Sequence, residues 1–271
     1  MYPMTMPVCK PLIPVYDKPL IYYPLAVLLQ AGIRDILIIV PPDEMYSFIK
    51  LFGDGSDLGI NITYKIQKVQ RGIADAFIIG KSFIGDDDVC LILGDNIFYG
   101  DGLAECLQKA RENKGTTIFG YYVEDPHPFG VVEFDENGKA VSIEEKPAEP
   151  RSNYIVPGLY FYDNSVVEIA ENVQPSERGE LDISSVNKEF LRRCDLNVVT
   201  LGRDFTWLDA GSAESLLRSA NTIMDIQKRT GRQVACLEEI AYKMGYIDRE
   251  QLRAVGESMK KTTYGQYILG L

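Results

Sequence analysis

The sequence contains one histidine and one tryptophan, and its five cysteines include no C-x-x-C pair. The histidine, His127, lies in the proline-rich stretch "DPHPFG", so we expect neither triad chemistry with a histidine base nor a histidine-rich metal site. An odd, unpatterned set of cysteines is typical of reduced thiols, which predicts a cytoplasmic protein.

Long apolar runs and an excess of positive charge are also lacking. No run approaches the roughly 20 residues of a membrane span, and we expect neither a signal peptide nor a membrane partner. The net charge of −11 disfavours nucleic acid as a partner, although one local basic pocket would suffice for a nucleotide. The remaining composition, 46% hydrophobic and 25% charged, is typical of a globular protein.

Helix-like and strand-like segments alternate over the first 125 residues. Amphipathic or apolar patterns predict helices over 20–33, 43–53, 72–84 and 102–114, with Pro19 in the first turn of the first helix. Apolar runs predict strands over 34–40, 60–67, 88–95 and 116–123. This alternation predicts an α/β fold with a Rossmann-like, doubly wound sheet.

The pattern changes after residue 125. A hairpin over 130–146 is predicted around Asn137-Gly138, followed by a strand over 153–163, two helices and a strand over 196–201. From Ser212 the sequence is helical, with breaks at Gly231, Gly245 and Thr262-Thr263. We expect one domain with a mixed sheet: a core over 1–125, an antiparallel insert over 126–211, and a helical tail over 212–271 that caps the core or forms a subunit interface.

The stretch "VCLILGDNIFYG" ends an apolar run on Asp95, which either forms a turn or binds a ligand. Ligands of open α/β sheets gather at the carboxyl ends of the strands. Two carboxylates and several lysines suit nucleotidyl transfer, which needs magnesium and cations for phosphate oxygens. Side chains that could converge with Asp95 stand in short motifs: Lys10, Lys18, Gln67, Gly72, Glu145, Lys146 and Asp209.

Seven motifs occur in order: "KPLIPVYDKPLIYYPL", "LGDNIFYG", "FGVVEF", "IEEKP", "GLYFYDN", "RGELDI" and "WLDAG". Together they resemble the sugar-phosphate nucleotidylyltransferases, from about Tyr2 to the last residues. The resemblance is greatest to members that use dTTP and glucose 1-phosphate. It implies a Mg²⁺-dependent enzyme that makes dTDP-glucose and pyrophosphate without a covalent intermediate, and whose insert binds the sugar phosphate. It also implies a homotetramer, with a second nucleotide site between subunits near "FYGDGL".

The resemblance places the functional residues on matching motifs. It implies magnesium ligands at Asp95 and Asp209. The implied nucleotide contacts are Lys10 on the triphosphate, Gln67 and Gly72 on the base, and Asp95. The implied sugar-phosphate contacts are Gly130, Glu145, Lys146, Val156, Tyr160 and Arg178, and the catalytic cations are Lys10, Lys146 and Arg178.

The sequence departs from the family at its start. The family opens with a strand and a glycine-rich loop of the type G-G-x-G-T-R-L, which this sequence lacks. We expect a truncated chain with a gap in the sheet, or another segment in place of the strand. Pro11 stands where the family usually has glutamine, and Gln70 where proline is common. Two alternatives therefore stay open: a non-catalytic nucleotide- or sugar-phosphate-binding homologue, and an enzyme that uses UTP or another sugar phosphate.

Overall fold

The structure is a computed structural model, and it describes residues 1–113 and 115–271. The chain forms two compact units whose segments alternate along the sequence. The expected division at residues 125 and 211 differs from these units, and the single-domain organisation stays a prediction. Unit 1 comprises Met1–Tyr64, Gly94–Gln108 and Leu208–Leu271, and unit 2 comprises Lys65–Leu93 and Lys109–Trp207.

Unit 2 is built on a mixed seven-stranded sheet. Its strands are β5 (Val89–Ile92), β7 (Thr116–Tyr122), β8 (Gly130–Phe134), β9 (Ala140–Glu145), β10 (Tyr154–Ile155), β11 (Leu159–Tyr162) and β12 (Leu196–Leu201). The order is β5-β11-β7-β10-β8-β9, and β12 lies against β7. β12 runs parallel to β7, and the other pairs in this sheet are antiparallel.

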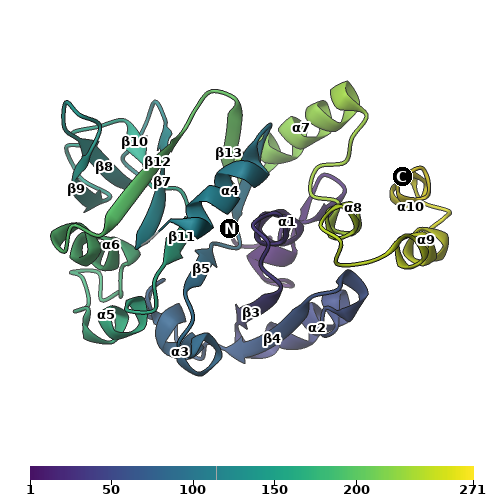
Figure 1. Ribbon diagram of the computed structural model, residues 1–271, viewed down its shortest axis with the longest axis horizontal. Helices are drawn as coiled ribbons and strands as arrows, with labels where there is room; N and C mark the ends of the chain where they lie inside the picture. The colour runs from purple at the N-terminus through teal and green to yellow at the C-terminus, as the bar shows by residue number, and fades with distance from the viewer. Residues whose placement is uncertain (114) are drawn as a thin grey trace. The chain divides into compact units, whose positions relative to one another are not determined.

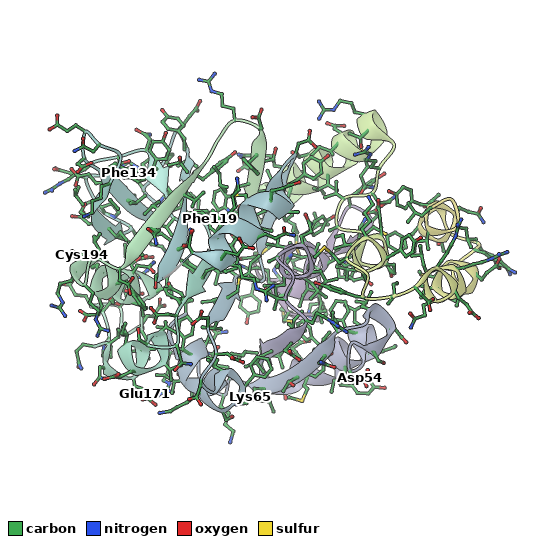
Figure 2. The ribbon with its side chains drawn as sticks, in the orientation of Figure 1. Asp54, Lys65, Phe119, Phe134, Glu171 and Cys194 are labelled. Atoms are coloured by element: carbon green, nitrogen blue, oxygen red, sulfur yellow. The ribbon has the colours of Figure 1, made fainter. Side chains whose placement is uncertain are left out.

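β7 is the central strand of this sheet because it pairs with β10, β11 and β12. Ile118 and Phe119 of β7 are buried, and Phe119, labelled in Figure 2, packs against Phe161 of β11 with ring centroids 6.2 Å apart. Helices α3 (Asp75–Ile84), α5 (Val166–Asn172) and α6 (Ile183–Arg192) contribute Phe77, Val166 and Phe190 to the core beside the sheet. The central strand and these helices thus form the core of unit 2.

The predicted hairpin over 130–146 is present as β8 and β9, with register pairs from Gly130–Glu145 to Phe134–Ala140. The Asp135 carboxylate accepts from the backbone N–H groups of Asn137 and Lys139, each at 2.9 Å. Gly138 has φ +78°, a left-handed conformation that glycine adopts without steric cost. The turn residues named from the sequence therefore form the turn.

The predicted strand over 153–163 is wrong as a single element. Pro157 and Gly158 separate β10 from β11, and both strands pair with β7. Proline lacks a backbone N–H and cannot continue a strand ladder, which explains the interruption.

Unit 1 combines a helical assembly with short strand pairs. Among its elements, wholly or in part, are β1 (Pro14–Val15), β2 (Lys18–Pro19), α1 (Tyr22–Gln30), β3 (Asp35–Val40), α2 (Met45–Phe52), β4 (Asn61–Ile66), β6 (Asn96–Gly100), α4 (Leu103–Glu112) and β13 (Phe205–Asp209). The tail adds α7 (Ala213–Thr230), α8 (Leu237–Lys243), α9 (Arg249–Ser258) and α10 (Thr263–Leu269). Single 3-10 turns lie at Lys10–Leu12, Pro42–Glu44 and Ser56–Leu58.

The tail helices begin and end at recognisable signals. Ser212 and Ser215 form a capping box at the start of α7, and Gly231 ends it with φ +68°. Residues of α7 pack with β1 and α1 in one core, which contains Val15, Tyr23 and Ile223. Figure 1 shows α9 and α10 side by side at the C-terminal end. The helical tail is thus a structural part of unit 1. The expected helix over 102–114 is present as α4, and position 114 lies outside the described residues.

Pro19 is not in the first turn of α1, as we expected, but in β2. Val15 pairs with Lys18 in the β1–β2 hairpin, and Leu20 N–H donates to Ile13 O at 2.9 Å. The chain must complete this hairpin before α1 begins at Tyr22.

Strands β3 and β5 each have one strand neighbour in the described chain. β3 pairs with β4, and β5 pairs with β11, so each strand leaves one edge without a strand partner. Apolar residues on both strands are only half-buried, including Leu37, Ile38, Leu91 and Ile92. The expected gap in the sheet stays a prediction.

Candidate active site

Asp95 lies in the turn between β5 and β6, so it is a turn residue as well as a candidate ligand. Its Oδ2 accepts from Lys10 Nζ at 2.9 Å, and its Oδ1 accepts from Asn96 Nδ2 at 2.9 Å. Both side chains of the Lys10–Asp95 pair are about a quarter to a third exposed. The carboxylate is therefore held beside a cation and still reachable by water.

Asp209 is the last residue of β13, which pairs with β6. The next residue, Ala210, donates its backbone N–H to Asp95 O at 2.9 Å. Asp209 Oδ2 accepts from Gly211 N at 3.1 Å. Asp95 and Asp209, 114 positions apart in the chain, thus stand on hydrogen-bonded neighbouring segments of unit 1.

The donor set at these segments fits magnesium. The described residues contain no cluster of three or more His, Cys, Asp or Glu side chains suited to a metal ion. Magnesium in phosphoryl-transfer enzymes commonly uses one or two carboxylates, with waters and substrate phosphates as the other ligands. Asp95 and Asp209 would be those carboxylates.

Lys10 is the first residue of the 3-10 turn Lys10–Leu12, and Cys9 is the N-cap of this turn. The Pro11 carbonyl accepts from Ile21 N at 2.8 Å, which ties this turn to the start of α1. A side chain at Gly94 would come within 3.1 Å of the Pro11 ring. Gly94 thus allows the lysine-bearing turn to pack closely against the turn that carries Asp95.

The sugar-side candidates Gly130, Glu145, Lys146 and Val156 meet in unit 2, at one end of β8 and β9. Gly130 is opposite Glu145 in the ladder, and Gly130 O accepts from Val156 N at 2.8 Å. Lys146 is exposed, and its backbone N–H donates to Phe129 O at 3.0 Å. Its φ of +46° is left-handed, which costs a non-glycine residue about 1 kcal/mol and is typical of functional positions.

Glu145 connects this end of the hairpin to the segment "RGELDI". Its Oε2 accepts from Ser184 Oγ, and its Oε1 lies 3.6 Å from Arg178. Arg178 also donates to Asp182 Oδ1 at 2.7 Å. A side chain at Gly130 would approach both Glu145 and Ser184 within 3.3 Å, so the glycine leaves room for this contact. The structure thus brings five of the six sugar-side candidates together.

Tyr160 is the sixth sugar-side candidate, and it belongs to the core of unit 2. It is 3% exposed, and its ring stacks on Tyr162 at 5.9 Å between centroids. Both rings lie in the core formed by the sheet and its helices. Val156, another sugar-side candidate, packs against this same core, and the role of Tyr160 in sugar binding stays a prediction.

Gln67 and Gly72, the candidate base contacts, lie between β4 and α3. Gln67 Nε2 donates to Asp75 Oδ2 at 3.0 Å. Gly72 has φ +111°. On either side of Gly72 the backbone forms a hydrogen bond with Leu181: Arg71 O accepts from Leu181 N, and Ala74 N donates to Leu181 O. A side chain at Gly72 would lie 2.5 Å from Leu181 O. Glycine is therefore required at this close approach of two backbones.

Sequence reasoning did not single out Asp75, Asp182 or Ser184. Each contacts a candidate residue: Asp75 contacts Gln67, Asp182 contacts Arg178, and Ser184 contacts Glu145. Arg178 and Asp182 stand in one motif, "RGELDI", so that motif was a usable signal. The Glu145–Ser184 contact spans 39 residues and has no local signature.

Comparison with known proteins decides the family. The family model "Nucleotidyl transferase" matches residues 1–226. The chain belongs to the nucleotidyl transferase family. Among curated relatives in this family, the glucose-1-phosphate thymidylyltransferase of Neisseria meningitidis serogroup A is 53% identical over 272 residues, covering 100% of this chain and 94% of the relative. The enzyme of that name from Mycolicibacterium smegmatis is 49% identical over 271 residues, with 100% and 94% covered.

Solved structures agree with this family assignment. A Bacillus anthracis protein assigned as a glucose-1-phosphate thymidylyltransferase, crystallised with sucrose, is 36% identical with a TM-score of 0.75, covering 82% of this chain and 89% of that one. A UDP-glucose pyrophosphorylase in complex with UDP-glucose is 21% identical with a TM-score of 0.74, covering 83% and 94%, and supports the fold alone. The predicted Rossmann-like α/β fold and the predicted enzyme class, a nucleotidyltransferase, are confirmed.

No helix among the described residues is long and apolar enough to cross a membrane.

Proposed function

We propose that this nucleotidyltransferase transfers a thymidylyl group from dTTP to glucose 1-phosphate, with Mg²⁺. A phosphate oxygen of glucose 1-phosphate attacks the α-phosphorus of dTTP, and the bond to the β-phosphate bridging oxygen breaks. The products are dTDP-glucose and pyrophosphate. The relatives named above carry this activity in their names, and the observation that supports it most is the Ala210 N–Asp95 O hydrogen bond beside the Lys10–Asp95 ion pair.

Each residue has a distinct role in this proposal. Asp95 and Asp209 would hold the magnesium ion, which supplies charge neutralisation at the phosphates when it is bound. Lys10 leaves Asp95 to neutralise the triphosphate oxygens. Lys146 and Arg178 neutralise the sugar phosphate, and Glu145 with the backbone of Gly130 and Val156 binds the sugar. Positioning and charge neutralisation are enough for such an exchange, because no enzyme-bound intermediate forms.

Pyrophosphate release from dTTP and glucose 1-phosphate, with Mg²⁺ and with EDTA, tests this function. We expect turnover only with Mg²⁺, and a loss of about 100-fold or more in kcat/KM for Asp95→Asn and Asp209→Asn. Asp225→Asn is the matched control, because Asp225 is an exposed residue of α7. Turnover that is unaffected by either site substitution would refute the assignment of the metal ligands.

The same assay separates the alternatives. Absence of turnover in a folded chain whose melting temperature is raised by glucose 1-phosphate would indicate a non-catalytic binding protein. Equal or greater turnover with UTP would refute the preference for thymidine nucleotides. The tetrameric state, the second nucleotide site and the cytoplasmic location stay predictions.

A further inference from the structure

Asp75, the first residue of α3, is a buried carboxylate with both oxygens in use. It is 1% exposed. Its Oδ2 accepts from Gln67 Nε2 at 3.0 Å, and its Oδ1 accepts from Arg71 at 2.6 Å. A carboxylate that is buried away from water needs hydrogen-bond donors such as these.

The contact with Asp75 restricts the side-chain amide of Gln67 to one orientation. An amide has an acceptor end and a donor end, and a flip about its last torsion exchanges them. A carboxylate only accepts, so Nε2 of Gln67 must face Asp75. The flipped amide would set Gln67 Oε1 against Asp75 Oδ2, with two oxygen atoms in contact and no hydrogen between them.

The fixed orientation matters for pyrimidine recognition. Gln67 keeps its Oε1 as an acceptor, together with its second Nε2 hydrogen as a donor. Thymine and uracil present an N3–H donor between two carbonyl acceptors, which complements this arrangement. Cytosine presents N3 as an acceptor beside an amino donor, so it would need the flipped amide.

We propose that Asp75 is a positioning residue that fixes the Gln67 amide and thereby makes the nucleotide site reject cytosine. This inference rests on the proposed role of Gln67 as a base contact. It goes beyond the proposed function, because it gives a structural reason why the site binds one kind of pyrimidine and not another. It does not distinguish thymine from uracil, because both bases carry the same N3–H.

A purely structural role for Asp75 is the competing explanation. An acidic residue in the first turn of a helix interacts favourably with the helix dipole, and Asp75 also pairs with Arg71 four residues earlier. Loss of such a role would lower the stability of the protein and weaken the binding of all nucleotides to the same extent. A change in the ratio of affinities for two nucleotides would not follow from it.

Calorimetric binding of dTTP and dCTP, in the presence of Mg²⁺, tests the proposal independently of turnover. Asp75→Asn is nearly isosteric, and its amide can face Gln67 with either end. We expect Asp75→Asn to lower the ratio of dTTP to dCTP affinity at least about tenfold, chiefly by improving dCTP binding. Asp75→Ser, with a hydroxyl that donates and accepts, releases the same restriction if the asparagine variant does not fold.

Two further variants sharpen the result. Gln67→Leu should reduce the same ratio, and adding Asp75→Asn to it should have no further effect, because both act through one amide. Lys81→Gln is the control on α3, because it removes an exposed ion pair with Glu171 and leaves Asp75 untouched.

The inference is overturned if folded Asp75 variants keep the wild-type ratio within twofold, or if wild type binds dTTP no more tightly than dCTP. Failure of the proposed reaction gives a different result. In that case wild type binds dTTP more tightly than dCTP and Asp75→Asn lowers this ratio, but no pyrophosphate is released.

Discussion

Lys18 is a buried cation whose removal should destabilise the protein. Its side chain is 3% exposed, and its Nζ donates to Asp17 Oδ1 at 2.7 Å, Gln233 Oε1 at 2.9 Å and Gln227 Oε1 at 3.3 Å. The ammonium also lies 5.3 Å from the centre of the Tyr264 ring. One side chain thus connects the β1–β2 hairpin to α7, to the segment after α7, and to α10.

The magnitude for Lys18→Met follows from the groups left behind. Gln227 Oε1 still accepts from Val234 N at 2.9 Å, and Asp17 still accepts from Gln227 Nε2 at 3.0 Å. Gln233 Oε1 and Asp17 Oδ1 lose their hydrogen bonds from Lys18, and each unsatisfied group lowers the free energy of unfolding by about 1 to 3 kcal/mol. Water at the part-exposed Asp17 and the relieved desolvation of the ammonium offset part of this cost. We expect a loss of about 3 kcal/mol in the free energy of unfolding.

Urea unfolding followed by circular dichroism measures this loss, as a fall in the midpoint of about 1 M. Lys260→Met serves as the control, because it breaks an ion pair whose side chains are 61% and 47% exposed, and it should cost less than about 0.5 kcal/mol. If Lys18→Met unfolds within 1 kcal/mol of wild type, the lysine does not stabilise the connection, and the reasoning is wrong.

Three more outcomes are expected. Burial lowers the pKa of Lys18 from 10.5, so the unfolded chain binds more protons than the folded chain at pH values between the folded-state pKa and 10.5. The free energy of unfolding of wild type, relative to that of Lys18→Met, should therefore rise as the pH approaches 10.5. A pH-independent difference in urea titrations would contradict this. Burial raises the pKa of Cys9 to about 11, which leaves about 1% thiolate at pH 9. Iodoacetamide should label exposed Cys194 first, with Cys9 labelling rising between pH 9 and 11 in peptide mass spectra. Gly72→Ala should lower the melting temperature, at a cost of about 1 to 3 kcal/mol, because its side chain would meet Leu181 O; an unchanged melting temperature would exclude the close approach.

Local patterns predicted the elements whose formation depends on local chemistry. The hairpin turn at Asn137-Gly138 and the end of α7 at Gly231 were both predictable, because glycine adopts left-handed φ at each turn. The closeness of the chain segments that carry Asp95 and Asp209 was also expected from the sequence, because both residues follow apolar runs. Their assignment as metal ligands still awaits a test.

Features that depend on tertiary packing could not be predicted. The motif "GLYFYDN" did not indicate that Tyr160 packs with Tyr162 in the core of unit 2, and the role of Tyr160 in sugar binding stays a prediction. The Lys18–Gln227 contact spans 209 residues, and nothing local to either residue indicates it. The restriction of Gln67 by Asp75 was missed for another reason: an Asp at a helix start is common and has a sufficient explanation there.

The chain passes between unit 1 and unit 2 after residues 64, 93, 108 and 207. Neither unit is therefore encoded by a continuous stretch of the gene, and no single cut in the coding sequence yields either one whole. A premature stop codon after residue 207 would complete the polypeptide of unit 2 and yet remove Asp209 with the entire helical tail. In a nascent chain, the early segments of unit 1 therefore cannot complete the fold of that unit until the last quarter of the protein has been synthesised.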